Sequence, residues 1–75
     1  MSKKSDLKRE ISESEKEIET LEKKRMRSQS ALLEAYLNNT SPNESDVEYF
    51  KIFSTLIELE RKNLRQLNEE LEKLD

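Results

Sequence analysis

Apolar residues recur at alternating steps of three and four on both sides of one turn-rich segment, NNTSPNES at 38–45. That segment holds the only proline, and the flanking stretches are rich in Glu, Lys, Leu and Arg. The alternation is typical of a coiled-coil seam, because it keeps one face of a helix apolar over many turns. The sequence therefore predicts an all-α, antiparallel two-helix coiled-coil hairpin. It forms a single domain over 1–75, with helices at about 5–37 and 46–74 and a loop at about 38–45.

The ends of the predicted helices carry capping signals. Ser41, which precedes Pro42, and Ser45 each begin a capping box that could start the second helix. The heptad register favours Ser45. Because the chain has no glycine, Asn38 or Asn39 is expected to end the first helix in the left-handed conformation.

The seam residues also predict how the helices are aligned. When paired residues have numbers that sum to 85, every layer joins complementary heptad positions, and Arg25 faces Glu60. A shift of one heptad, to a sum of 78, sets Ile18 against Glu60 and Leu32 against Asp46, and is disfavoured. Arg25 and Glu60 are therefore predicted to form a charged pair that fixes the register, since a buried unpaired charge penalises slipped alignments.

A second set of apolar residues lies outside the seam, in the half of the hairpin nearest the loop. A two-helix hairpin cannot cover them, and contiguous exposed apolar residues usually mark an interface. They predict a non-enzymatic protein–protein interaction module. Its partner is a second copy, completing a homodimeric four-helix bundle, or a helical segment of another protein. A fragment that packs on a missing domain stays open as well. The predicted interface residues are Met26, Leu33, Tyr36, Leu37, Tyr49, Ile52, Leu56 and Leu59.

Composition excludes most catalytic chemistry. Of the 75 residues, 41% are charged and 32% hydrophobic, and Gly, His, Cys and Trp are absent. Without His or Cys there is no ordinary zinc site, thiol nucleophile or imidazole base, and without Gly no phosphate-binding loop. Glu13 and Glu17 share a helix face but are interpreted as ordinary surface charge. The sequence predicts no enzyme, cofactor, metal or small-molecule substrate. Lacking cysteine, a secretory signal and a membrane span, it also predicts a cytoplasmic protein.

Two alternatives involve nucleic acid. Lys23, Lys24 and Arg27 belong to a basic run that could contact phosphates, although the net charge of −3 favours a solvated face.

The acidic turn, Asn43-Glu44 followed by Glu48-Tyr49, resembles the coiled-coil arm of bacterial transcript-cleavage factors of the Gre family. That resemblance implies an RNA-polymerase-associated regulator with Glu44 and Asp46 as tip carboxylates. The chain departs from the family in lacking the glycine and a clear counterpart of the aspartate of the tip motif.

Overall fold

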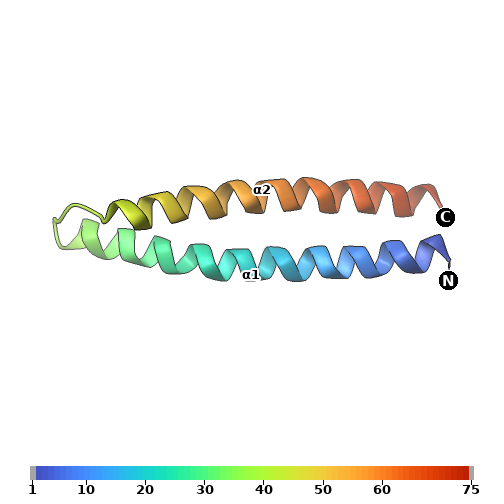
Figure 1. Ribbon diagram of the computed structural model, residues 1–75, viewed down its shortest axis with the longest axis horizontal. Helices are drawn as coiled ribbons and strands as arrows, with labels where there is room; N and C mark the ends of the chain where they lie inside the picture. The colour runs from blue at the N-terminus through green and yellow to red at the C-terminus, as the bar shows by residue number, and fades with distance from the viewer. Residues whose placement is uncertain (1, 75) are drawn as a thin grey trace.

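Residues 2–74 are described by the computed structural model, in which two long helices pack side by side as an antiparallel hairpin. Helix α1 spans Lys3–Leu37 and helix α2 spans Glu44–Lys73. The molecule is a rod of 55 × 16 × 15 Å, with both termini at the end opposite the loop (Figure 1). The predicted all-α helical hairpin is confirmed.

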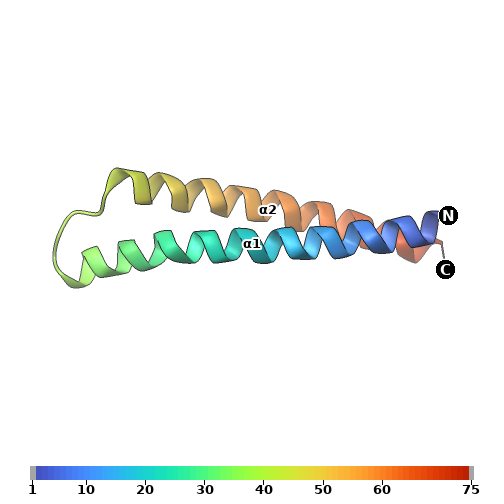
Figure 2. The same cartoon turned by 60° about the horizontal axis from the view of Figure 1, so that its bottom comes forward.

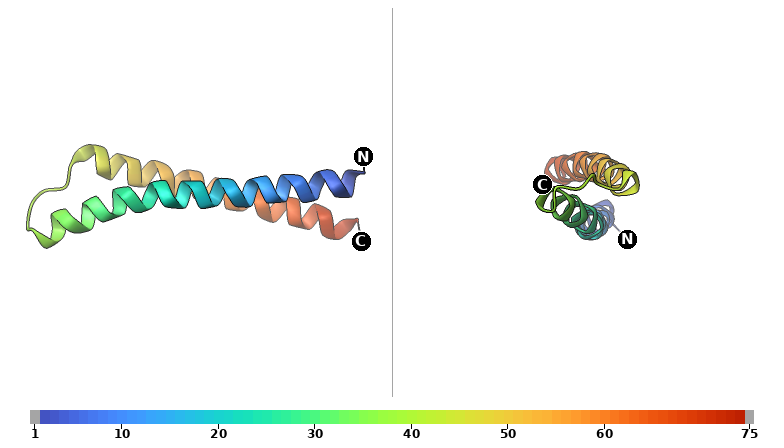
Figure 3. Two further views of the ribbon diagram at one scale, coloured as in Figure 1. Left: turned by 90° about the horizontal axis from the view of Figure 1, so that it is seen from below. Right: turned by 90° about the vertical axis from the view of Figure 1, so that its left-hand side faces the viewer.

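The two helices wind around each other at a shallow angle. In Figure 2 they cross near the terminal end, and in the left view of Figure 3 they cross near the middle of the rod. This winding keeps the seam of each helix against the other along the rod, as expected for a coiled coil. The radius of gyration is 17.0 Å, against about 11 Å for a compact domain of this length. The core is therefore a single line of side chains.

The predicted seam forms this core. Ile57 is completely buried, and Leu7, Ile18 and Leu21 are 4–9% exposed. Every α1 position of the repeat is buried or half-buried: Leu7, Ile11, Ser14, Ile18, Leu21, Arg25, Ser28, Leu32 and Ala35. So are the α2 positions Phe50, Phe53, Ile57, Glu60, Leu64, Leu67 and Leu71.

The helix ends are set by side chains that replace missing backbone partners. The Ser2 hydroxyl accepts a hydrogen bond from the backbone N–H of Ser5 at 3.1 Å, so α1 begins two residues before the predicted start. At the other end of α1, Asn39 adopts the left-handed conformation, with φ of 54°. Asparagine tolerates this region better than most residues, as the absence of glycine led us to expect.

Helix α2 starts at neither predicted serine cap. Its cap is Asn43, whose Oδ1 accepts from the backbone N–H of Ser45 at 2.8 Å. Asparagine is among the strongest N-cap residues, and this start places Glu44 and Asp46 in the first turn, at the positive end of the helix dipole. Ser45 becomes a helical residue instead of the cap.

The predicted alignment of the two helices is wrong by about one heptad. The Ser14 hydroxyl donates to Oε2 of Glu60 at 2.7 Å. In the register that sums to 85, Ser14 would face Leu71, eleven residues and about 16 Å from Glu60. The second cross-helix contact joins Glu22 to Arg61 at 3.4 Å. The residue numbers of the two contacts sum to 74 and 83, on either side of 78, which is the alignment the seam pattern disfavoured.

Longer overlap explains the shifted register. In the predicted alignment Leu7 has no residue of α2 opposite it, whereas in the structure it is 4% exposed. Burying one leucine contributes about 1.5–3 kcal/mol. The shift moves Leu74 to the end of the hairpin, opposite the first turn of α1, and its side chain is 43% exposed. The hydrogen bond from Ser14 reduces the desolvation penalty of placing the Glu60 carboxylate against α1.

Two leucine truncations distinguish the registers. Leu7→Ala is expected to lower the free energy of unfolding by about 2 kcal/mol or more, because it leaves a cavity in the buried seam. Leu74→Ala, the matched change at an exposed site, should cost less than about 1 kcal/mol. Urea unfolding followed by circular dichroism at one fixed protein concentration measures both. The reverse ranking of the two variants would restore the predicted register.

Candidate interaction surfaces

Glu60 is a charged residue at a half-buried position of the α2 seam, and it is held by two uncharged donors. Its Oε2 accepts from the Ser14 hydroxyl at 2.7 Å and from Nδ2 of Asn63 at 2.8 Å. The bond from Asn63, and then that from Ser14, lower the pKa of the Glu60 carboxyl, while partial desolvation acts in the opposite direction. The two hydrogen bonds therefore favour the ionised form of the Glu60 carboxyl.

The predicted partner of Glu60 lies elsewhere. Arg25 is half-buried in the α1 seam, and no ion pair within residues 2–74 includes it. In an alignment near 78, Arg25 and Glu60 are displaced by one heptad, or about 10 Å along the helix axis. The predicted pair of Arg25 and Glu60 is therefore not formed. Glu60 is hydrogen-bonded to Ser14 and Asn63 instead.

Different side chains occupy the two edges of the seam. At one edge, Arg61 reaches across to Glu22 at 3.4 Å and also pairs with Glu58 at 3.6 Å. At the other edge, a hollow is lined by Lys24 and Tyr49, together with neighbours from both helices. The remaining lining residues of this hollow are Arg27, Ser28, Asp46 and Phe53.

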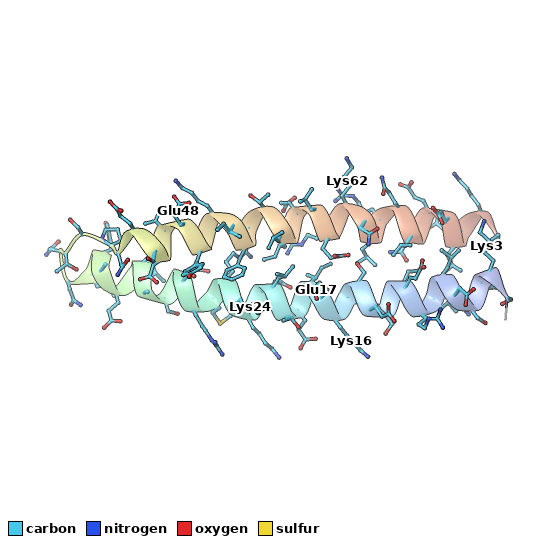
Figure 4. All side chains as sticks on the ribbon, viewed as in Figure 1. Lys3, Lys16, Glu17, Lys24, Glu48 and Lys62 are labelled. Atoms are coloured by element: carbon cyan, nitrogen blue, oxygen red, sulfur yellow. The ribbon has the colours of Figure 1, made fainter. Side chains whose placement is uncertain are left out.

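The same edge becomes acidic toward the termini. There Glu17 and Glu60 line an open groove, and the other residues around it are Glu10, Glu13, Ser14, Asn63 and Leu67. Within residues 2–74, no group of three or more acidic side chains is arranged to hold a metal ion. The side chains of Glu10, Glu13 and Glu17 are exposed. Figure 4 shows Lys16, on the outer side of α1, pointing away from α2.

All eight predicted interface residues are exposed, by 41% to 78% of their surface. We call those of α1 the α1 stripe: Met26, Leu33, Tyr36 and Leu37. We call those of α2 the α2 stripe: Tyr49, Ile52, Leu56 and Leu59. Within residues 2–74, nine large apolar side chains are exposed when Leu74 is included, whereas only four apolar residues are buried.

The two stripes face opposite sides of the hairpin and do not form one continuous patch. Residues four or seven apart lie on nearly the same side of a helix. Met26 and Leu33 therefore lie on the side of α1 where Glu22 meets Arg61. Tyr49 lines the hollow at the other edge of the seam, beside Lys24, and the rest of the α2 stripe continues from it. A flat partner on one face can cover only one stripe.

The α2 stripe is the more regular of the two. Its members are spaced three, four and three, whereas Gln29 and Ser30 interrupt the α1 stripe. The Tyr49 ring stacks on Phe53, with ring centroids 6.1 Å apart and planes inclined by 19°, which ties one end of the stripe to the seam. Shallow open hollows flank Leu56 and Leu59 on the outer surface of α2. This surface therefore has both apolar side chains and shallow hollows in which a partner side chain can pack.

Carboxylates lie close to the basic residues of the nucleic-acid alternative. The Lys23 ammonium pairs with Glu19 at 3.3 Å, while Lys24 and Arg27 line the same hollow as Asp46. Asp46 is half-buried in the first turn of α2. The basic run is therefore interleaved with carboxylates, and one of the two proposed tip carboxylates lies partly inside the hairpin.

Comparison of the chain with protein-family models, with curated proteins and with solved structures finds no match. No helix within residues 2–74 combines the length and the apolar character that crossing a membrane requires.

Removing the Ser14 hydroxyl should raise the pKa of Glu60 toward its ordinary value of 4.5. Because the folded state lowers this pKa, ionised Glu60 stabilises the fold above about pH 4.5, and the contribution is lost as the pH falls through the lower folded value. Ser14→Ala should weaken that pH dependence. Titration of the Glu60 carboxyl carbon by NMR measures the shift, and Ser12→Ala, on the exposed side of α1, is the matched control. An unmoved pKa in Ser14→Ala would contradict the observed bond.

Exchanging the charges of Arg25 and Glu60 tests whether these two residues face each other. Glu60→Arg and Arg25→Glu should each destabilise the hairpin, and the double variant should show the sum of the two losses within about 0.5 kcal/mol, because the sites lie about 10 Å apart along the axis. A double-mutant cycle from urea unfolding gives the coupling energy. Recovery of more than about 1 kcal/mol in the double variant would show that Arg25 does face Glu60.

Proposed function

We propose that this chain is a non-enzymatic protein–protein interaction module, a helical hairpin that associates with itself or docks a helical partner. The observation that carries the proposal is the exposure of eight large apolar side chains in the loop half of the hairpin, from 41% for Leu56 to 78% for Tyr36. Single exposed leucines are normal on protein surfaces, whereas apolar residues repeated along one side of a helix are typical of contact surfaces.

The arrangement of charge supports the same role. The outer positions of the terminal half are mainly charged or polar, so apolar surface is concentrated where the helices approach the loop. An amphipathic helix of a partner could lay its apolar side on either stripe. Completion to a four-helix bundle by a second copy would bury one stripe per chain and leave the other for a further contact. A cytoplasmic setting belongs to the proposal, since the chain has no cysteine to form a structural disulfide.

The proposal is tested by placing charges on each stripe. Leu56→Glu and Tyr49→Lys on α2, and Leu33→Glu on α1, should reduce the solution mass or abolish capture of a partner, because a charge buried in an apolar contact is strongly unfavourable. Sedimentation equilibrium at micromolar protein gives the mass, and circular dichroism checks that each variant is helical.

Matched controls introduce the same glutamate outside the stripes. Gln66→Glu lies at the same heptad position as Leu59, and Ser12→Glu at the same position as Leu33, both in the polar terminal half. Unchanged mass and unchanged partner capture in all three stripe variants would refute the proposal. Binding of nucleic acid at low salt that falls steeply as salt rises, with Lys24 and Arg27 required, would favour the alternative regulator.

A further inference from the structure

We propose that the α2 stripe packs antiparallel on the α2 stripe of a second copy, about a two-fold axis close to Thr55. This inference rests on the proposed interaction role and names its partner. The α2 stripe is preferred over the α1 stripe because its spacing is unbroken and Tyr49 is stacked on Phe53.

The apolar residues of the stripe match themselves when the chain direction is reversed. The spacing three, four, three reads the same from either end. When paired residue numbers sum to 108, Tyr49 of one copy faces Leu59 of the other, and Ile52 faces Leu56. Two-fold symmetry repeats each contact, so the pairing gives four apolar layers. All four side chains are 41–60% exposed and accessible to such a partner.

The charges beside the stripe are also complementary under the same symmetry. Glu48 and Lys62 are fourteen residues apart and therefore lie on the same side of α2, next to the stripe. Both are on the side of α2 turned away from α1 in Figure 4. Neither takes part in an ion pair or side-chain hydrogen bond within residues 2–74. The numbers of these flanking residues sum to 110, two more than those of the apolar layers, so the two-fold axis brings Glu48 of each copy within about 3 Å, along the helix axis, of the position opposite Lys62 of the other.

The direction of pairing follows from these charges. A parallel arrangement in register would place Glu48 beside Glu48 and Lys62 beside Lys62, which is repulsive at both sites. Charges that flank a helical seam commonly decide the orientation and the choice of partner. The antiparallel arrangement has two attractive pairs and leaves the uncharged Thr55 of the two copies facing each other at the axis.

Charge reversal tests the pairing. At low salt, Glu48→Lys and Lys62→Glu should each raise the dimer dissociation constant about tenfold, because each creates two like-charge contacts per dimer. The double variant should return close to the wild-type constant. Glu69→Lys is the matched control, since it occupies the same heptad position as Lys62 but would face residue 41 of the other copy, before α2 begins. Sedimentation equilibrium measures the dissociation constant of the wild type and of the four variants.

Crosslinking tests the direction independently. The chain has no cysteine, so Thr55→Cys and Glu69→Cys each provide one reactive thiol. A short bismaleimide reagent should link two copies of Thr55→Cys and leave Glu69→Cys unlinked. Equal linking of both variants would show parallel pairing and overturn the inference. Linking of neither would overturn it as well.

The outcomes separate this inference from the proposed function. If Leu56→Glu abolishes association while the charge reversals change nothing, the interaction module stands and the antiparallel pairing is wrong. A wild-type chain that stays monomeric also overturns the pairing. In that case the interaction module stands only if a helical partner binds the wild type and fails to bind the charged stripe variants.

Discussion

Two helices without a third element can bury only one side of each other, and this constraint shapes the whole molecule. The seam supplies the burial, yet Ile57 is the sole residue within 2–74 with no exposed surface. Every apolar residue outside the seam stays in contact with water unless another molecule covers it. Both the modest core and the exposed stripes are consequences of the same geometry.

The narrow seam also explains how a carboxylate is tolerated within it. Glu60 is half-buried and close to water at the edge of the seam, and its oxygen accepts from Ser14 and Asn63. A small residue at position 14 leaves room for the longer side chain to bend toward it. A charged group with two donors at a partly solvated edge carries a much smaller desolvation penalty than a fully buried ion pair would.

The antiparallel alignment decides where the two stripes lie. Glu22 and Arg61 meet at one edge of the seam, and Lys24 and Tyr49 line the other. Each stripe continues from a different edge, so the hairpin has two apolar sides near its loop and polar sides near its termini.

Most of the fold follows from the sequence alone. The three-four repeat and the breaker at 38–45 predict two helices, their antiparallel pairing and the residues of the seam, because helix periodicity is a local property of the chain. The exposure of residues such as Leu33 and Leu56 follows from the same repeat, since they fall outside the seam. The Asn43 cap was missed because three neighbouring residues can all accept the first amides of a helix, and their choice depends on the path of the loop.

The register and the division of the apolar surface were decided only by the tertiary structure. A heptad repeat is nearly unchanged by a shift of seven residues. The match of apolar residues across the seam therefore distinguishes only weakly between alignments that differ by one heptad. Burial of Leu7 and the hydrogen bond from Ser14 to Glu60 favour the observed alignment over the predicted one. Both depend on contacts between residues far apart in the chain. Likewise, spacing shows that each stripe lies outside the seam, but only the packed pair of helices shows that the two stripes face opposite ways.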